Sequence, residues 1–352
     1  MNFDEIMEIN NLAILKSFLK ANFVLQRHRR IAVSISGGSD SDVILDLIQR
    51  VKGDQEIRYI WFDTGLEYQA TKDHLTYLEG KYHIKIERIR AVKPIPVCCH
   101  EFGIPFISKF ASAMIERLQN HGFKWEDKPL EELLQEYPNA KNAVKWWCNA
   151  NNINDGFDKS MFNINHNRYL KEFMIANPPD FKISARCCEW AKKRVSKQFI
   201  DDNHIDLMVI GIRRAEGGIR AGIYKNCFTD NQGETADQYR PIFYYSDQDK
   251  EAYEKQFDVN HSACYSEYGF TRTGCVGCPF ALDLEENLQK TEMFEPKLLK
   301  ACNTIFGKSY EYTRKYREFR AETKRKERLK GQITFDEFLD GDERDVTVNY
   351  IQ

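Results

Sequence analysis

The sequence predicts an α/β fold, a parallel twisted sheet with helices on both faces. Short apolar runs such as Ile31–Ser36 and Asp206–Gly211 are typical of buried strands. Segments with the helical spacing of apolar residues lie between such runs. Strands that alternate with helices form parallel sheets, because a parallel neighbour is reached only through a crossover connection. The 352 residues, 42% hydrophobic and 30% charged, are typical of a globular protein with one α/β core and an appended region.

The expected elements follow one another in a regular order. Residues 4–29 have the apolar spacing of a helix that packs outside the first strand. The strand Ile31–Ser36 ends in a glycine turn, and Val43–Ile48 then returns to helical spacing. The later elements are a second strand at Ile57–Phe62, a helix around Tyr68–Tyr82, a third strand at His83–Ile89 and a further core strand at Asp206–Gly211.

We expect three regions along the chain. Residues 1–102 and 180–280 form the α/β domain, which a mostly helical insertion at residues 103–179 interrupts. Residues 281–352 form a charged helical C-terminal region. No apolar run approaches the roughly 20 residues of a membrane-spanning helix, and the N-terminus lacks the features of a signal peptide. We therefore expect a cytoplasmic protein without membrane contact.

The charge is nearly balanced overall but uneven along the chain. A formal net charge of −2 excludes a globally basic nucleic-acid binder. Residues 314–330 are nevertheless strongly basic, with tyrosine and phenylalanine interleaved. The run is typical of a solvated helix with alternating charges, and a contact face for nucleic acid is the functional alternative.

The strongest local pattern is a glycine- and serine-rich loop between the first strand and the next helix. Glycines let the backbone turn tightly and approach an anion, and the free N–H groups of a helix start face phosphate oxygens. Serine hydroxyls add further hydrogen bonds. The loop matches neither of the glycine-rich patterns G-x-x-x-x-G-K-[ST] and G-x-G-x-x-G. The expected phosphate-binding residues are Ser36, Gly37, Gly38, Ser39, Asp40 and Ser41.

Polar and basic residues follow two other strands. Asp63 and Thr64 end the second strand beside the loop, where a carboxylate or hydroxyl could hold ribose or adenine. Planar guanidinium groups, suited to phosphate or sulfate, follow the core strand at residues 206–211. The candidates there are Gly211, Arg213, Arg214 and Arg220, with a surface salt bridge as the alternative for each arginine.

Ten cysteines in a reducing compartment indicate metal binding or catalysis rather than disulfides. Cys275 and Cys278 form a C-x-x-C pair, and Cys187 and Cys188 are adjacent. Four thiolates fit zinc or a 4Fe–4S cluster, and adjacent cysteines suit the more widely spaced irons of a cluster better than one zinc ion. Unliganded structural cysteines remain a third interpretation. Cys264 is a spare ligand or a reactive thiol.

The pair Cys98-Cys99 is less informative. Buried packing is the default interpretation for such cysteines, with a resolving or sulfur-carrying thiol as the second.

The loop Ser36–Ser41 resembles the pyrophosphatase (PP) loop of the adenine-nucleotide alpha-hydrolase superfamily, whose sheet is Rossmann-like. Within that superfamily, most of residues 30–280 resembles the phosphoadenosine phosphosulfate (PAPS) reductase family. The similar segments, in order, are the loop, Phe62–Glu67, Gly211–Arg220, Arg240-Pro-Ile and Ser246–Asp249. The four cysteines also resemble the cluster motif of adenylyl-sulfate reductases. The resemblance implies an adenine nucleotide, namely ATP, adenylyl sulfate or PAPS, and an iron–sulfur cluster.

The resemblance leaves the reaction open. Reductases of the family have a C-terminal Glu-Cys-Gly-(Leu/Ile)-His segment whose cysteine attacks sulfur, and no cysteine follows Cys302 here. We therefore expect an enzyme that cleaves ATP at the α-phosphate, with Mg²⁺, to activate a substrate for sulfur-related transfer. Asp40, the three arginines and Cys264 are the candidate catalytic residues. The expected partners, besides the nucleotide, are a nucleic acid or a sulfur-donor protein.

Two alternatives stay open beside that expectation. One is an adenylyl-sulfate or PAPS reductase that uses Cys264, Cys98 or a separate thiol partner as nucleophile. The other is a nucleotide-binding defence or regulatory partner that does not turn over its ligand.

Overall fold

The computed structural model describes residues 3–151, 160, 162–217 and 223–330. The chain divides into two compact units. The first comprises Met1–Ala113 and Lys182–Gly307, and the second comprises Met114–Phe181 and Lys308–Gln352. No helix among the described residues is long and apolar enough to cross a membrane.

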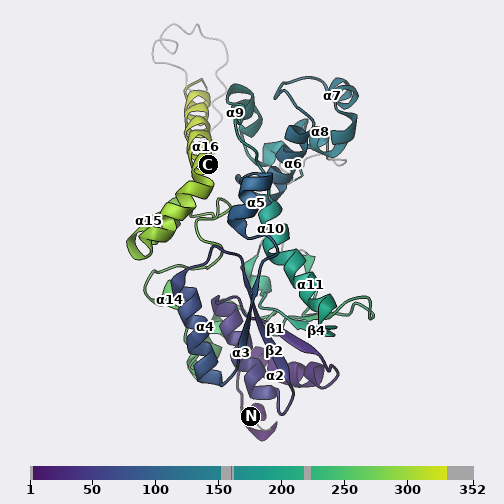
Figure 1. Ribbon diagram of the computed structural model, residues 1–352, viewed down its shortest axis with the longest axis vertical. Helices are drawn as coiled ribbons and strands as arrows, with labels where there is room; N and C mark the ends of the chain where they lie inside the picture. Colours follow the sequence, from purple (N-terminus) through teal and green to yellow (C-terminus); the bar gives the residue numbers. More distant parts are fainter. Residues whose placement is uncertain (1–2, 152–159, 161, 218–222, 331–352) are drawn as a thin grey trace, which may run out of the picture. The chain divides into compact units, whose positions relative to one another are not determined.

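The first unit contains a six-stranded, mostly parallel sheet in the order β3-β2-β1-β4-β6-β5. Figure 1 labels three of its strands, β1, β2 and β4. Every neighbouring pair is parallel except β5 and β6, which are antiparallel. The predicted parallel α/β fold is thus confirmed. The strands are β1 (Ile31–Ser34), β2 (Ile57–Asp63), β3 (Ile86–Arg90), β4 (Leu207–Val209), β5 (Phe228–Thr229) and β6 (Asp237–Tyr239).

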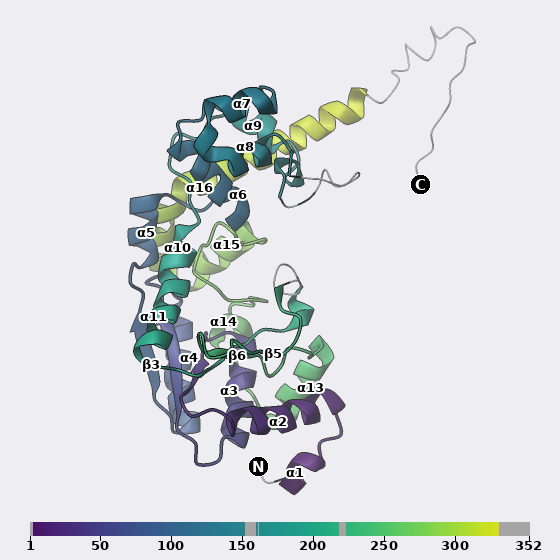
Figure 2. The same ribbon diagram turned by 90° about the vertical axis from the view of Figure 1, so that its right-hand side faces the viewer.

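Alternating residues of the central strands divide the core into two layers. Ile31 and Val33 of β1 pack on one face with buried residues of α2, α3, α4 and α13. Ala32 of β1 and Met208 of β4 point to the other face, where Phe199 of α11 covers them. In that first layer α2 and α13 lie side by side, as Figure 2 shows. Helices therefore cover both faces of the sheet, as expected for parallel strands.

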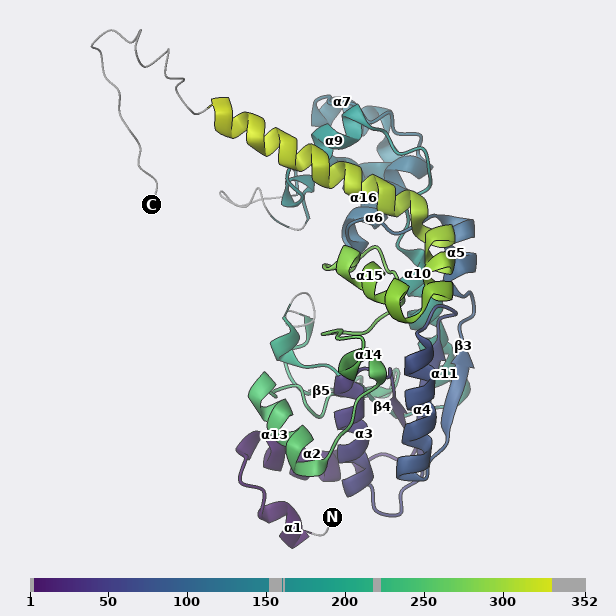
Figure 3. The ribbon, with the colours of Figure 1, turned by 90° about the vertical axis from the view of Figure 1, so that its left-hand side faces the viewer.

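The helices of the first unit begin and end at identifiable signals. The predicted single helix over residues 4–29 is two helices, because the side chain of Asn11 caps a new helix by accepting from the N–H groups of Ala13 and Ile14. Ser246 and Asp249 form a capping box at the start of α13. The short α14 lies beside α4 (Figure 3). The helices are α1 (Phe3–Met7), α2 (Leu12–Leu25), α3 (Ser39–Val51), α4 (Gln69–Tyr82), α5 (Ile95–Phe102), α10 (Arg186–Cys188), α11 (Arg194–Asp202), α13 (Asp247–Phe257), α14 (Ala263–Ser266) and α15 (Leu284–Phe294).

The second unit is helical and has its own aromatic core. Phe123, Trp125 and Trp147 pack together with ring centroids 5.3–5.7 Å apart. Phe173 contacts the rings of Tyr312 and Tyr316 on the last helix. The helices α7 (Leu130–Glu136), α8 (Lys141–Trp147) and α9 (Leu170–Ala176) belong to this unit, while α6 (Lys109–Asn120) and α16 (Pro296–Lys330) begin in the first unit and end in the second.

Candidate functional site

The loop after β1 is shaped by two glycines. Gly37 has φ +71°, and a Cβ there would lie 2.5 Å from Cγ2 of Thr71, so a side chain is excluded. Gly38 precedes α3 without a side-chain cap, which leaves the N–H groups of the helix start to other partners. The N–H of Ser39 donates to the hydroxyl of Tyr265 at 3.1 Å. The N–H groups of Ser41 and Asp42 donate to the carbonyl of Gly38. An anion at this helix start would therefore compete with the hydroxyl of Tyr265 for the N–H of Ser39.

A cavity of about 850 Å³ lies at the carboxyl ends of β1, β2 and β4, within the first unit. Ligands of open α/β sheets bind at this end of the strands. Its lining includes the phosphate loop and six cationic side chains, which favour an anionic ligand. The cations are Lys192, Lys193, Lys197, Arg213, Lys250 and Arg272.

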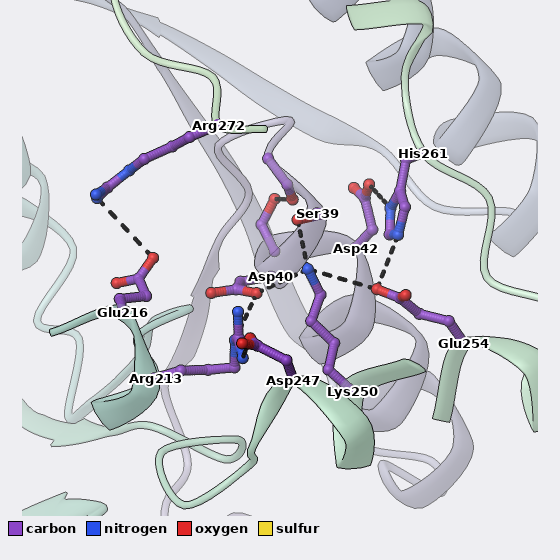
Figure 4. A network of polar contacts seen from close by, with 12 residues as sticks. Ser39, Asp40, Asp42, Arg213, Glu216, Asp247, Lys250, Glu254, His261 and Arg272 are labelled. Atoms are coloured by element: carbon purple, nitrogen blue, oxygen red, sulfur yellow. Dashed lines mark hydrogen bonds and ion pairs between the residues drawn. The ribbon is translucent and has the colours of Figure 1, made fainter. Parts of the chain in front are cut away.

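Asp40 is the centre of an ion-pair network on the cavity wall (Figure 4). Its Oδ1 lies 2.9 Å from Nε of Arg213 and 3.1 Å from Nζ of Lys250. Arg213 also donates to Asp247 at 2.8 Å, and Lys250 donates to the hydroxyl of Ser39 at 2.6 Å. The pKa of Arg213, which burial lowers, is raised on balance by Asp247 and Asp40. The network thus fixes two cations beside the loop.

A second network lies behind the first. The carboxylate of Asp42, 1% exposed, contacts Nδ1 of His261 at 2.8 Å and Nε2 of His74 at 3.1 Å. The Nε2 of His261 contacts Glu254 at 2.9 Å, and Glu254 lies 3.5 Å from Nζ of Lys250 (Figure 4). Burial lowers the pKa of His261, but its two carboxylate partners outweigh this and raise it to about 9. His261 therefore carries a positive charge at neutral pH.

Of the other residues predicted for the nucleotide site, one lines the cavity and two do not. Gly211 lines the cavity, and a Cβ there would lie 3.3 Å from the backbone of Asp40, so the end of the core strand runs close to the loop. Asp63 and Thr64 do not lie among the described residues that line the cavity. Asp63 instead accepts from the N–H of Gly65, and buried Thr64 donates to Glu67 at 2.6 Å.

The three predicted arginines also differ in whether they line the cavity. Arg213 is buried in the ion-pair network, whereas Arg214 is exposed and is not part of the cavity lining. Arg220 lies outside the described residues.

The four predicted ligand cysteines converge in the first unit. Cys187 and Cys188 interact with each other, and both interact electrostatically with Cys278. Cys275 interacts with Cys188 and Cys278, and its Sγ lies 3.9 Å from the hydroxyl of Thr64. Burial raises the pKa of Cys278, to about 12, with a further contribution from Cys275. The four cysteines thus lie close enough to influence one another electrostatically; Cys187 is buried and the other three are half-buried.

The donor chemistry of this thiol site fits a cluster or zinc, because clustered buried thiols are the ligands that both take. Among the described residues, no three or more His, Cys, Asp or Glu side chains are arranged to hold a metal ion. The metal assignment therefore stays a prediction.

Cys264 lies apart from the thiol site. It is fully buried beneath Thr71, whose hydroxyl is 3.7 Å from its sulfur. Burial raises the pKa of Cys264. A reactive thiol needs the opposite environment, exposed and with a lowered pKa. The surroundings of Cys264 are those of a packed structural cysteine.

Sequence reasoning missed three residues of these sites. Lys250 and His261 complete the networks around the loop, and the hydroxyl of Tyr265 accepts from the N–H of Ser39. Lys250 directly follows the recognised segment Ser246–Asp249, which was the available signal. His261 and Tyr265 lie in stretches without a motif, and only tertiary packing brings them to the loop. Cys99, one of the pair Cys98-Cys99, contacts Cys187.

The sheet and the loop define an α/β protein with a glycine- and serine-rich loop at the end of its first strand, beside a cavity lined by cationic side chains. The family model of the phosphoadenosine phosphosulfate reductase domain matches residues 30–102 and 157–281, more than half of the chain. The chain belongs to this family, as the resemblance in the sequence predicted.

Relatives outside the family model are distant. An uncharacterized protein of Methanocaldococcus jannaschii is 25% identical over 291 residues, which cover 81% of this chain and 42% of that protein. The chain thus spans less than half the length of that relative. The phosphoadenylyl-sulfate reductase of Candida auris, a phosphate complex, has a TM-score of 0.41 and 10% identity over 78% of this chain and 96% of its own. The NH3-dependent NAD synthetase of Campylobacter jejuni, in complex with nitrate, has a TM-score of 0.34 and 12% identity. The match covers 89% of this chain and 96% of the synthetase chain.

Proposed function

We propose that this protein is an enzyme that binds ATP in the cavity and cleaves it at the α-phosphate to activate a substrate for sulfur-related transfer. One observation supports this most directly. The same cavity is lined by Gly274, the residue before Cys275, and by five residues of the loop: Ser36, Gly38, Ser39, Asp40 and Ser41. Lys192, also in the lining, interacts with Cys275. A nucleotide held by the loop would therefore lie beside the thiol site.

The proposed reaction has two steps. A nucleophilic atom of the substrate attacks the α-phosphorus, the bond from that phosphorus to the bridging oxygen breaks, and pyrophosphate leaves with the negative charge. A sulfur nucleophile then displaces AMP from the activated substrate. The N–H groups at the start of α3, with Arg213 and Lys250, would stabilise the charge on the leaving pyrophosphate. Mg²⁺ bound with ATP would screen the same charge.

Cys187, Cys188, Cys275 and Cys278 would hold a 4Fe–4S cluster, with zinc as the alternative. When bound, a cluster would supply a place to bind sulfur. The substrate is either a nucleic acid or a small molecule, and the sulfur source is a sulfur-donor protein or a small sulfur compound. The exposed basic residues of α16 support a nucleic acid; they include Lys315, Arg320, Lys324, Arg325 and Lys326.

The family match supports a second function, the reduction of adenylyl sulfate or PAPS to sulfite. Such a reaction needs a nucleophilic thiol. Cys264 and Cys98 are both buried, and burial raises the pKa of each thiol. A separate thiol partner would therefore supply the nucleophile. A nucleotide-binding defence or regulatory protein without turnover is the third candidate.

The first experiment separates the three functions. The full chain, purified without oxygen, is incubated with ATP and Mg²⁺, and with adenylyl sulfate or PAPS and a thiol donor. Pyrophosphate release from ATP supports the proposal, with candidate acceptors of both classes added in separate reactions. Sulfite formation instead identifies a reductase. Tight nucleotide binding with neither product identifies a binding protein and contradicts the proposal.

A matched pair of variants tests whether the network holds the nucleotide. Arg213→Met removes a buried cation beside the loop, whereas Arg214→Met removes an exposed one outside the cavity lining. We expect Arg213→Met to weaken ATP binding about tenfold or more, since a charge-assisted contact contributes about 1.5–3 kcal/mol. Arg214→Met should bind ATP like the natural chain. Equal binding by all three proteins would contradict the placement of the nucleotide in this cavity.

The metal is tested separately. Iron, acid-labile sulfide and zinc are measured in the purified chain, in Cys275→Ser and in Cys148→Ser, a control outside the thiol site in the second unit. Iron with sulfide and visible absorbance, lost only in Cys275→Ser, is the expected result. Stoichiometric zinc would replace the cluster in the proposal, and a chain without either metal would remove the metal from it.

A further inference from the structure

The helix α13 delivers a lysine to the phosphate loop from a distant part of the sequence. The capping box of Ser246 and Asp249 fixes the first turn of α13, and Lys250 follows directly. The Nζ of Lys250 lies 2.6 Å from the hydroxyl of Ser39 and 3.1 Å from Oδ1 of Asp40. Its side chain is only 14% exposed, and that exposed part faces the cavity that it lines. A long cationic side chain is thus held at the first residue of α3.

Each carboxylate near Lys250 has another cation as its partner. Asp40 pairs with Arg213 at 2.9 Å, and Glu254 pairs with His261 at 2.9 Å. The contact between Lys250 and Glu254 is longer, 3.5 Å. An anion that enters the cavity can therefore form an ion pair with Lys250 while Asp40 and Glu254 each keep another cation as partner. Leaving a buried charge unpaired is the main cost of breaking such networks, and it does not arise here.

Lys250 and Arg213 differ in the freedom of their charged groups. Nε and Nη1 of Arg213 bind two different carboxylates, Asp40 and Asp247, so the planar guanidinium is fixed. The ammonium of Lys250 is a compact charge on a flexible stem with three rotatable donors. It can follow a phosphate group while its stem stays packed.

We propose that Lys250 binds the pyrophosphate part of the nucleotide and selects ATP over AMP. This inference rests on the proposed nucleotide function of the cavity. The terminal phosphates distinguish ATP from AMP, and a cation at Ser39, on the loop that would hold phosphates, recognises charge that AMP lacks. The guanidinium of Arg213 is fixed beside the loop by two carboxylates, whereas the ammonium of Lys250 can move to the terminal phosphates that AMP lacks.

The test is calorimetric titration of the full chain with ATP, AMP and inorganic pyrophosphate. Lys250→Met should weaken ATP and pyrophosphate binding about tenfold or more, the loss of one charge-assisted contact, and should change AMP binding less than about twofold. Lys250→Arg keeps a cation and should retain most of the preference for ATP. Lys255→Met on the same helix is the matched control, because Lys255 is exposed and pairs with Glu251, one turn away, at 3.0 Å.

The outcomes separate this inference from the proposed function. A natural chain that binds no adenine nucleotide overturns the function itself. A natural chain that binds ATP, with Lys250→Met unchanged or weakened equally for ATP and AMP, overturns only the role of Lys250. Melting curves show whether each variant folds. If Lys250→Met does not fold, Lys250→Gln, which keeps a hydrogen-bond donor, is titrated instead and is subject to the same criteria.

Discussion

His261 is a histidine with a carboxylate on each ring nitrogen. Asp42 faces one nitrogen and Glu254 the other, and Lys250 faces Glu254 from the far side. His74 also contacts Asp42, and the ring of Tyr265 lies with its centroid 5.7 Å from that of His261. This imidazolium holds together α3, α13 and the segment before α14, which are the elements around the loop.

The raised pKa of His261 predicts a pH-dependent contribution to stability. In the unfolded chain a histidine titrates near 6.5, and in the folded protein the pKa is about 9. Because the pKa is higher in the folded state, the protonated imidazole stabilises the folded protein fully below about pH 6.5. This stabilisation is lost as the pH rises through about 9. The difference between the two pKa values corresponds to about 3 kcal/mol.

The measurement is the melting temperature of the natural chain and of His261→Gln between pH 6 and 9.5. The difference between them should be largest at pH 6 and should shrink steadily towards pH 9. His121→Gln, at an exposed position in the second unit, is the control and should show no such trend. A difference that is constant over the whole range would contradict the ion-pair assignment of His261.

At the scale of elements, the turn between β1 and α3 depends on a close contact with α4. We predict that Gly37→Ala destabilises the protein and abolishes ATP binding, because the new methyl group meets Thr71 and because φ is +71°. Gly53 has φ +56° with no atom within 4 Å of a Cβ, so Gly53→Ala should have only the backbone cost of a left-handed alanine, roughly 1 kcal/mol. Denaturant unfolding measures the stability loss of both variants.

The contact with Thr71 can be separated from the backbone cost. Gly37→Ala should cost at least about 1 kcal/mol more than Gly53→Ala, since overpacking typically costs about 1–3 kcal/mol. Thr71→Ser deletes the methyl group that would lie 2.5 Å from the Cβ of the new alanine, so the double variant should recover part of the difference. Equal costs at both glycines would show that the contact is unimportant.

Elements with strong local patterns were predictable from the sequence, whereas very short strands and a helix boundary set by one capping side chain were not. The apolar runs at β1, β2 and β4 predicted central strands, because strands buried on both faces are nearly continuous in hydrophobicity. The two residues of β5 and the three of β6 are too short for a period to show. The break before α2 depends on the capping side chain of Asn11 rather than on periodicity.

In the candidate site, too, residues that are consecutive in the sequence were predictable and residues brought together by folding were not. The loop was predictable because its glycines, serines and position after a strand are consecutive in the sequence. Lys250 and His261 are 211 and 219 residues from their partners Ser39 and Asp42, so no local pattern relates them. Asp63 and Thr64 do not line the cavity, and their side chains bond to Gly65 and Glu67, so their expected contact with ribose or adenine stays a prediction.

At the scale of the whole molecule, each of the two units has its own core. In the second unit, residues from the middle of the chain pack against the middle of α16 through Phe173, which is 1% exposed and contacts Tyr312. We predict that Phe173→Ala destabilises this unit by roughly 3 kcal/mol, the usual cost of removing a buried phenylalanine. The tryptophans of the unit, including Trp125 and Trp147, report its unfolding by fluorescence.

Phe162→Ala provides the comparison, because Phe162 is 51% exposed in the same unit. It should change stability by less than about 0.5 kcal/mol. Similar losses for both variants would mean that the contact between α9 and α16 does not stabilise the unit.

The two edges of the sheet have a consequence for association. At one edge β3 carries Glu87, Arg88 and Arg90, with Glu87 paired to Arg58 at 2.6 Å. At the other edge β5 is only two residues long and runs opposite to its neighbour. Charged or very short edge strands discourage backbone pairing with a second chain. The sheet is therefore protected against edge-to-edge aggregation at high protein concentration, such as that in an overexpressing cell.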